Sequence, residues 1–256
     1  MCGRFVTASS PALIADRFAV DEVDATVASD LEPDYNVSPR RNVLVVREQS
    51  LDEGKSQRVL SRVRWGLVPS WAKELKIGDR MINARAETVT TKPAYRRAFA
   101  KKRCLIPADG FYEWQAQPGT ADGTVPGGRK PRKQPYFIHR KDGEPLAFAG
   151  LWETWKVPED RPENEKDVAG DDGWLRSCVI VTTTANDLMA PIRNRMPVIL
   201  PESAWERWLD PGEHDVDALA ALLVPAPNEL LEAYPVSTAV NNARNTGPEL
   251  ARAVVV

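Results

Sequence analysis

Hydrophobic and polar residues alternate over several short stretches of the chain, which is the pattern of half-buried β-strands. Residues 42–48 (NVLVVRE) and 57–71 (QRVLSRVRWGLVPSW) show it, and the second stretch ends in a proline-containing turn. The β-branched run at 174–186 is long enough for a central strand, and residues 232–238 predict another strand. The pattern therefore predicts a fold built mainly on β-sheet.

Two further strand regions contain turn signals. Residues 135–155 carry apolar runs on either side of an Asp-Gly pair, which predicts a β-hairpin. Residues 104–115 predict a strand that a turn at 107–110 interrupts. Both regions add strands to the predicted sheet.

Helical signals are short and few. Residues 9–20 begin with a serine cap and a proline in the first turn, a basic stretch precedes Cys104, and residues 202–210 and 215–224 predict two more helices. The acidic, mixed residues 21–34 predict a loop. We expect an α+β fold, dominated by β-structure, in which short helices surround a mixed or antiparallel sheet.

Two segments, 116–135 and 156–173, are rich in proline, glycine and charge and show no periodicity. Strands resume on each side of them, so we expect mobile surface loops rather than domain linkers. A chain of 256 residues can bury one sizeable core, and we expect a single domain over residues 1–256.

The composition, with 43% hydrophobic and 27% charged residues, is ordinary for a soluble globular protein. No apolar run approaches the length of a membrane span, and the N-terminus lacks the pattern of a signal peptide. We therefore expect a cytoplasmic protein without membrane association, and a monomer by default.

The cysteines and histidines argue against a structural metal or a disulfide framework. The three cysteines, Cys2, Cys104 and Cys178, are odd in number and form no C-x-x-C motif, and neither His139 nor His214 lies near a cysteine in sequence. The chain also lacks a P-loop, a dinucleotide fingerprint and an H-E-x-x-H motif. We expect no metal and no cofactor.

Charge is distributed unevenly along the chain. The formal net charge is −2, yet residues 40–103 hold 17 lysines and arginines against 6 aspartates and glutamates, an excess of 11 positive charges. A solvated surface is the usual explanation of such an excess. Because the region is rich in arginine, whose planar guanidinium suits phosphate oxygens, a face that binds a polyanion is the alternative.

The opening sequence MCGRF places a cysteine where removal of Met1 would make it the first residue. Its amine, with a pKa of about 8, and its thiol, with a pKa of about 8.5, would both have nucleophilic forms near neutral pH. Such an aminothiol condenses with an aldehyde and closes to a thiazolidine. The alternative is that Cys2 is only a small residue after the initiator.

Three other motifs carry candidate chemistry. In MINARAET, Asn83, Arg85 and Glu87 share one face of an extended segment. In DGFYEW, Glu113 lies between aromatic residues, where desolvation would raise its pKa toward the range of a general acid. RWGLVPSWA offers two tryptophans, including Trp65, as a stacking platform. Structural roles remain open: tryptophans in the core, Glu113 in an ion pair and Asn83 capping a turn.

Seven motifs, in order along about residues 2 to 245, closely resemble those of the SRAP family (SOS response-associated peptidase), the abasic-site processing proteins. They are MCGRF, YNVSP (35–39), RWGLVPSWA (64–72), NARAET (83–88), RCLIPADGFYEW (103–114), AGLWE (149–153) and NRMPVIL (194–200). The resemblance implies a compact α+β fold with a basic channel, and binding of single-stranded DNA that contains abasic sites. It also implies a role in the DNA damage response and, in bacteria, a place at the nucleoid.

The resemblance further implies a chemistry at the N-terminus. After removal of Met1, which could be self-catalysed, Cys2 is the nucleophile that captures the sugar aldehyde as a thiazolidine DNA–protein crosslink. Asn83 orients the Cys2 terminus or the sugar, and Glu113 is the acid/base that also assists crosslink reversal. The enzyme class implied is thus a crosslinking protein with peptidase (hydrolase) and lyase-like activity.

The resemblance also implies the DNA contacts. Arg4 and Arg85 would hold phosphates that flank the lesion, and Trp65 and Pro39 would contact bases or sugars. Arg195, in the NRMPVIL motif, is expected to bind DNA as well.

At Arg193 this chain departs from the family, which usually has a histidine there that donates a proton to the sugar ring. Arginine stays protonated in proteins, so it can donate hydrogen bonds and balance phosphate charge but cannot shuttle protons. One hypothesis is that Arg193 acts electrostatically and binds DNA while Glu113 carries all proton transfer. The other is that the protein kept DNA binding and lost efficient chemistry.

Two other functions fit parts of the sequence. In an N-terminal-nucleophile amidase or peptidase, the Cys2 thiolate would attack a carbonyl with the α-amine as base. A non-catalytic single-strand binder would use the basic region alone and would not need Cys2.

Overall fold

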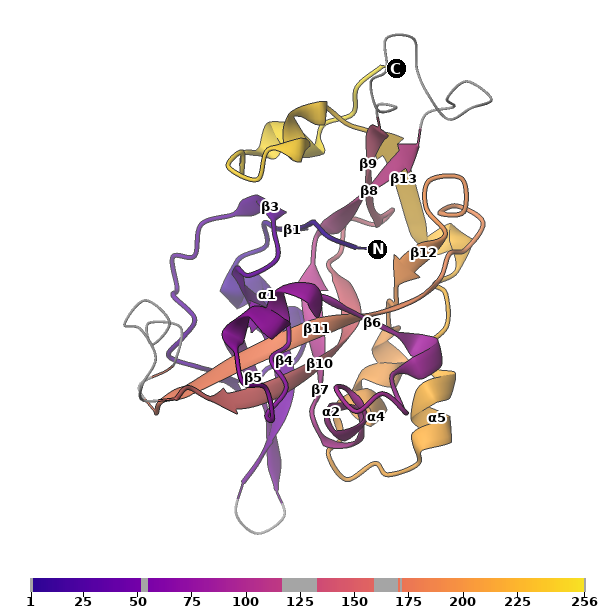
Figure 1. The fold of residues 1–256 in the computed structure, drawn as a ribbon. Helices are drawn as coiled ribbons and strands as arrows, with labels where there is room; N and C mark the ends of the chain where they lie inside the picture. The colour runs from indigo at the N-terminus through magenta and orange to yellow at the C-terminus, as the bar shows by residue number, and fades with distance from the viewer. Residues whose placement is uncertain (1, 52–54, 117–132, 159–169, 171, 256) are drawn as a thin grey trace.

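The computed structural model describes residues 2–51, 55–116, 133–158, 170 and 172–255. Strands dominate it, and short helices lie around them (Figure 1). This arrangement confirms the predicted α+β, β-dominated fold. The prediction of one domain over residues 1–256 stays a prediction.

The strands form two sheets. The first has five strands in the order β13-β9-β8-β1-β3. Their bounds are Phe5–Thr7 (β1), Asp34–Val37 (β3), Gly110–Ala116 (β8), Lys133–Arg140 (β9) and Leu231–Pro235 (β13). All four pairings in this sheet are antiparallel.

The second sheet runs in the order β12-β11-β10-β7-β4-β5-β2, with β6 paired to β11. The bounds are Glu22–Val23 (β2), Asn42–Ser50 (β4), Ser56–Trp65 (β5), Asn83–Arg85 (β6), Arg103–Ala108 (β7), Leu146–Lys156 (β10), Trp174–Thr184 (β11) and Arg195–Pro197 (β12). The strand β11 also pairs in parallel with β5, with Ser177 opposite Arg64 and Cys178 opposite Trp65. That pairing closes β11, β10, β7, β4 and β5 into a small barrel.

The helices are short, as the sequence predicts. They are Pro11–Arg17 (α1), Arg96–Lys101 (α2), Trp205–Leu209 (α4) and Val216–Ala221 (α5), with 3-10 turns at Leu75–Arg80 (η2), Ala86–Thr88 (η3), Glu202–Ala204 (η4), Asn228–Leu230 (η5), Thr238–Asn241 (η6) and Pro248–Ala251 (η7). Ser10 caps α1 by accepting a hydrogen bond from the Leu13 amide. None of the helices in the described part of the chain is long and apolar enough to cross a membrane.

The predicted hairpin over 135–155 is wrong. Its two strands form, but β9 pairs with β8 and β13 while β10 pairs with β7 and β11, so they belong to different sheets. The turn at Gly143, with φ of +78°, sends the chain from one sheet to the other. The two strands have partners in different sheets, yet Ile138 of β9 and Phe148 of β10 reach the same buried cluster, so the core is satisfied without pairing them to each other.

The predicted loops are described only at their ends. The stretch between the strands is shorter than the loop predicted for 116–135, because β8 runs to Ala116 and β9 begins at Lys133. Residues 117–132 lie outside the described residues. Of the loop predicted for 156–173, residues 159–169 and 171 lie outside them as well. Within the loop predicted for 21–34, the two residues of β2 pair in parallel with β5.

One buried cluster connects the barrel to the N-terminus. It brings together Cys2, Phe5 and Trp65 with residues from β7, β8 and β10. The Phe5 ring packs edge-on against Trp65, with centroids 5.0 Å apart, and against Phe148 at 6.1 Å. The phenylalanine of MCGRF therefore anchors the N-terminal residues to the core and fixes the position of Cys2.

Candidate active site and nucleic-acid interface

Hydrogen bonds along the backbone hold the N-terminal residues in place. In β1, Phe5 is opposite Phe111 of β8, and the Tyr112 amide donates to the Arg4 carbonyl at 3.0 Å. The carbonyl of Cys2 accepts a hydrogen bond from Asn83 Nδ2 at 2.8 Å. Residues far apart in sequence thus meet at Cys2.

The Cys2 thiol is fully buried, and its Sγ lies 3.8 Å from the Arg4 carbonyl oxygen. Burial, and then the negative charge of Glu113, raise the pKa of this thiol far above its ordinary value. In the chain that still carries Met1 the thiol is therefore un-ionised near neutral pH, and the expectation of an accessible ionised form after removal of Met1 stays a prediction. A base is needed to take its proton as it reacts.

Asn83 lies at the start of β6, where Ile180 of β11 is its partner in the sheet. While Nδ2 binds the Cys2 carbonyl, Oδ1 is buried and has no hydrogen-bond partner within the described residues. A buried acceptor without a partner is costly unless something else supplies the donor. Asn83 therefore offers an acceptor beside Cys2.

Glu113 lies on β8 and its side chain is only 3% exposed. Burial raises the pKa of its carboxyl, and the charge of Arg193 is among the influences that oppose the rise. The predicted effect of desolvation on Glu113 is confirmed. A carboxyl whose pKa is raised toward neutrality is suited to accept and return a proton.

Arg193 faces this carboxyl from the segment before β12. Its Nε is 3.7 Å from Glu113 Oε2, and its side chain is 41% exposed. A cavity of about 400 Å³ lies beside them, lined by Glu113, Trp114, Lys133, Arg193 and Asn241. The carboxyl that influences the Cys2 thiol is thus reached from solvent through a cavity with two cationic side chains.

Among the expected DNA contacts, Arg85 is exposed and Pro39 is partly exposed. Arg195 binds Glu87 through two contacts, Nη1–Oε1 at 2.8 Å and Nη2–Oε2 at 3.0 Å, and donates to the Thr182 carbonyl at 2.6 Å. The hydrogen bond from Arg195 is the main cause that lowers the pKa of Glu87. Much of the charge of Arg195 is therefore balanced within the protein.

Arg4 is engaged inside the fold. Its Nη1 donates to Asn36 Oδ1 at 2.7 Å and to the Val240 carbonyl at 3.0 Å. The buried Asn36 amide in turn donates to the carbonyls of Val240, Asn242 and Asn245. These bonds fasten the C-terminal segment to β1 and β3, which gives Arg4 a structural role in addition to the expected one.

The structure contradicts the expected contact of Trp65 with a base or sugar. The ring has no exposed surface, and its Nε1 donates to the Ile82 carbonyl at 2.9 Å. A ring without an exposed face cannot stack on a base. Trp71, in the same motif, is 61% exposed. The sequence pattern could not separate the two, because both tryptophans lie in one short apolar motif.

Two residues of the Glu113 cavity, Lys133 and Asn241, carry no motif that identifies them. Asn241 Oδ1 accepts a hydrogen bond from Trp114 Nε1 at 2.7 Å. Trp114 follows Glu113 directly, so its place beside the site could have been read from the motif. Asn241 and Lys133 come from distant segments and become neighbours only in the fold.

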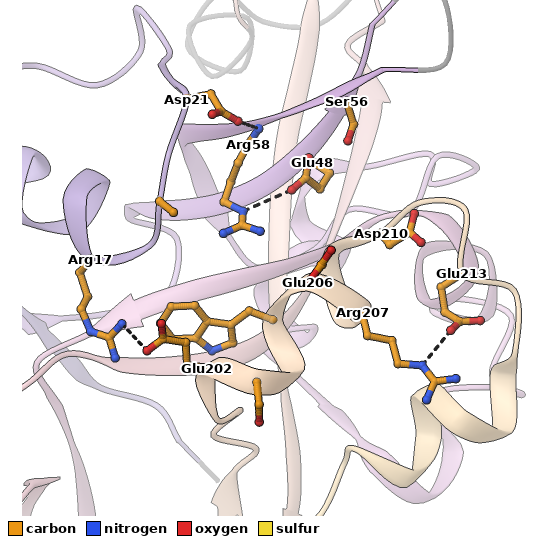
Figure 2. Close-up of a pocket in the computed structure, with 13 residues that line it drawn as sticks. Arg17, Asp21, Glu48, Ser56, Arg58, Glu202, Glu206, Arg207, Asp210 and Glu213 are labelled. Carbon is orange, nitrogen blue, oxygen red and sulfur yellow. Dashed lines mark hydrogen bonds and ion pairs between the residues drawn. The ribbon is translucent and has the colours of Figure 1, made fainter.

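A larger cavity of about 850 Å³ lies elsewhere, between α1, β4, β5 and α4. No predicted site residue lines it, and two ion pairs cross its lining: Arg17 with Glu202 at 2.8 Å, and Arg207 with Glu213 at 2.8 Å (Figure 2). Within the described residues, no group of three or more His, Cys, Asp or Glu side chains could hold a metal ion. The arrangement around Cys2 is thus where unusual chemistry concentrates.

Comparisons with known proteins identify the family of this chain. The family model "SOS response associated peptidase (SRAP)" matches residues 1–243. The abasic site processing protein YoqW of Bacillus subtilis is 41% identical over 251 residues, covering 98% of each chain. The abasic site processing protein HMCES of Xenopus tropicalis is 34% identical over 250 residues, covering 88% of this chain and 67% of the relative.

Solved structures show the same fold. A crystal structure of a protein from Bacteroides thetaiotaomicron has a TM-score of 0.78 and 25% sequence identity, and the match covers 99% of this chain and all of the other. With the family model spanning nearly the whole sequence and relatives above 30% identity, the chain belongs to the SRAP family.

Proposed function

We propose that this protein processes abasic sites in single-stranded DNA by forming a covalent crosslink through Cys2. The observation that carries the proposal is the convergence of Asn83 and Glu113 on the N-terminal residues, through a 2.8 Å hydrogen bond to Cys2 and through the influence of Glu113 on its thiol. Relatives with this chain's length carry the name abasic site processing protein.

The reaction needs a free α-amine on Cys2, and therefore removal of Met1. The amine adds to the aldehyde carbon of the ring-opened sugar, and loss of the aldehyde oxygen as water gives an imine. The thiol sulfur then adds to the same carbon while the thiol proton leaves and the imine nitrogen gains one. The product is a thiazolidine, and the only other product is one water molecule.

Glu113 moves the protons in this sequence. Its raised pKa lets the carboxylate take the proton of the buried thiol, which would otherwise stay un-ionised. The same carboxyl, once protonated, can return the proton when the ring opens again, so it serves reversal as well. Arg193, at 3.7 Å, balances its charge without taking part in proton transfer.

The DNA contacts that we propose are Arg4, Arg85, Arg193 and Arg195 for phosphates and Pro39 for a sugar or base. Single strands suit such a site better than duplex, because exposed bases can stack while arginines meet phosphates. The aldehyde, rather than any base edge, would supply specificity. The expected cytoplasmic location and monomeric state stay predictions.

The test incubates protein whose loss of Met1 is verified by intact mass with single-stranded DNA that carries one abasic site. We expect a covalent species on a denaturing gel, absent with undamaged DNA and absent for Cys2→Ala. A wild-type protein that binds this DNA but never becomes attached to it would refute the proposal and leave a non-catalytic binder.

The peptidase activity in the family name is proposed for the protein's own N-terminus. Cys2→Ala and Glu113→Gln, expressed in the same cells, should then retain Met1 by intact mass while the wild type loses it. Complete loss of Met1 in both variants would assign its removal to another enzyme.

A further inference from the structure

A second groove, lined by arginines, lies away from the Glu113 cavity. It has a volume of about 510 Å³ and lies where β4 begins, β5 ends and β11 begins. Arg40, Arg41, Arg62, Arg64 and Arg176 line it, together with Trp174. Among the described residues, no carboxylate is part of this lining.

The positive charge of the groove is only partly balanced. Asp79 lies 2.6 Å from Arg64, Asp172 lies 2.7 Å from Arg176, and Asp34 lies 3.5 Å from Arg41. In the part of the chain that the structure describes, three carboxylates at the margin thus face five guanidinium groups, since Arg40 reaches only the Asp79 already paired with Arg64, at 3.9 Å.

Arg62 is the least satisfied of the five. Within the described residues it makes no ion pair, and its buried Nε has no hydrogen-bond partner. Its neighbour two positions along β5, Arg64, also has a buried Nε without a partner. Because alternate residues of a strand share a face, both guanidinium groups belong to one side of β5. Donors left unpaired in a cationic groove favour an anion with several oxygens.

Arg40 adds an independent observation. Its φ of +75° is in the left-handed region, which costs a non-glycine residue about 1 kcal/mol or more. Two bonds hold it there: the Arg40 amide donates to the Trp65 carbonyl at 2.8 Å, and Arg64 Nη1 donates to the Arg40 carbonyl at 3.0 Å. The fold thus maintains a strained residue whose side chain is 68% exposed at the groove.

A short path of contacts connects the groove to Cys2. Arg40 follows Pro39, a proposed DNA contact, and its amide donates a hydrogen bond to the Trp65 carbonyl. Trp65 Nε1 donates to the Ile82 carbonyl, and the next residue, Asn83, binds Cys2. Because Arg40 follows Pro39 directly, a DNA strand that contacts Pro39 would also meet the edge of the groove.

We propose that this groove binds the phosphate backbone of the DNA strand on one side of the abasic nucleotide, with Trp174 stacking on a base. The proposal rests on the proposed function and extends its binding site. Trp174 is 38% exposed at the groove, and a stacked base with phosphates on arginines is the usual mode of sequence-independent single-strand binding. The groove would add affinity and fix strand direction without reading sequence.

The test measures binding of undamaged single-stranded DNA of about 4 and about 16 nucleotides, the range of common single-strand sites. Arg41→Ala/Arg62→Ala removes two proposed phosphate contacts, and both side chains can be shortened without loss of a backbone contact. We expect the longer strand to lose at least about 10-fold in affinity, and the salt slope to fall by about 1.4, or about 0.7 per phosphate contact. The shorter strand should bind as before.

The matched control is Arg96→Ala/Arg97→Ala, which removes two exposed arginines from α2. It accounts for the general loss of positive charge. A groove variant that binds the longer strand as tightly as this control would overturn the proposal.

Two further readouts separate the elements of the proposal. Trp174→Ala should weaken binding of the longer strand without changing the salt slope, because stacking releases no counterions. Extending an abasic oligonucleotide on its 5′ side and on its 3′ side separately should raise affinity on one side only; equal gains on both sides would overturn the groove. Failure of the wild type to crosslink would refute the proposed function, whereas length-dependent binding of undamaged DNA tests the groove on its own.

Discussion

At the scale of single residues, Glu113 and Arg193 form the most consequential pair. The carboxyl is buried and its pKa is raised, while the arginine beside it is half-exposed and holds a charge that it does not give up. A histidine at the position of Arg193 would be able to exchange a proton near neutral pH. Of the two side chains, only Glu113 can therefore transfer a proton.

Arg193→His should speed the turnover of the crosslink, because it adds a second group that can donate a proton to the sugar. Crosslink formation and release would be followed in single-turnover time courses, with Arg193→Gln as a control that removes the charge without adding a titrating group. Equal rates for wild type and Arg193→His would contradict the assignment of all proton transfer to Glu113.

Glu113→Gln should stabilise the protein at neutral pH by on the order of 1 kcal/mol, since it removes a buried charge. The raised pKa means that the folded state holds the proton more tightly than the unfolded state. In the wild type, the stability that this bound proton contributes is fully present below the unfolded-state pKa. It is lost as pH rises through the folded-state pKa.

Thermal melts at neutral pH and at about pH 4, near the ordinary carboxyl pKa, check this prediction. The gain from Glu113→Gln should shrink at the lower pH. Glu153→Gln is the comparison: it replaces a buried carboxylate that is in close contact with Lys102, and it should destabilise the protein. A loss of stability in Glu113→Gln at neutral pH would show that the charged form is well compensated.

At the scale of elements, the strand β1 decides where Cys2 lies. Asp109, in the turn between β7 and β8, accepts hydrogen bonds from the amides of Ala8, at 2.6 Å, and Ser9, at 3.0 Å. Phe5 anchors the other end of the strand in the core. A three-residue strand is held at both ends, and the reactive residue is positioned as a consequence.

Asp109→Ala should lower the free energy of unfolding by about 1 to 3 kcal/mol, because two amides lose their acceptor. It should also slow crosslinking, since β1 loses one of its anchors. Denaturant unfolding and single-turnover crosslinking, each at a pH where the wild type is stable, measure the two effects. Asp142→Ala, at an exposed aspartate paired with Arg140, should change neither.

The pattern of the sequence predicts most elements of this fold. Alternation identified β4 and β5, the β-branched run identified β11, and the serine and proline signals identified α1. The pairing of strands was harder to predict from the sequence. The Asp-Gly turn predicted a hairpin between β9 and β10, but these strands belong to two different sheets. A local turn signal carries no information on which distant strand offers the better partner.

At the scale of the whole molecule, the net charge of the chain and the local charge of residues 40–103 have opposite signs. The chain as a whole is slightly acidic, with a net charge of −2, while residues 40–103 carry the excess of positive charge. In the fold this region supplies Arg85 beside the active site and four of the arginines of the second groove. Local potential rather than net charge is what a DNA strand meets.

Binding to undamaged single-stranded DNA should therefore weaken steeply with salt despite the acidic isoelectric point. With about four phosphate contacts, raising monovalent salt from about 50 to about 200 mM should cost about 50-fold in affinity. Fluorescence anisotropy across a salt series measures the slope. A slope near zero would mean that these arginines do not meet phosphates.

The sequence by itself determined most of the elements and the α+β class, because the periodicity of hydrophobic residues is a local property. It also indicated Cys2, Asn83 and Glu113 through their motifs. Only the tertiary structure decided that Trp65 is buried while Trp71 is exposed, that Arg4 binds Asn36, and that the Cys2 thiol loses its ordinary pKa. The exposure of a side chain and its hydrogen-bond partners depend on segments distant in sequence, and those segments meet only when the barrel closes.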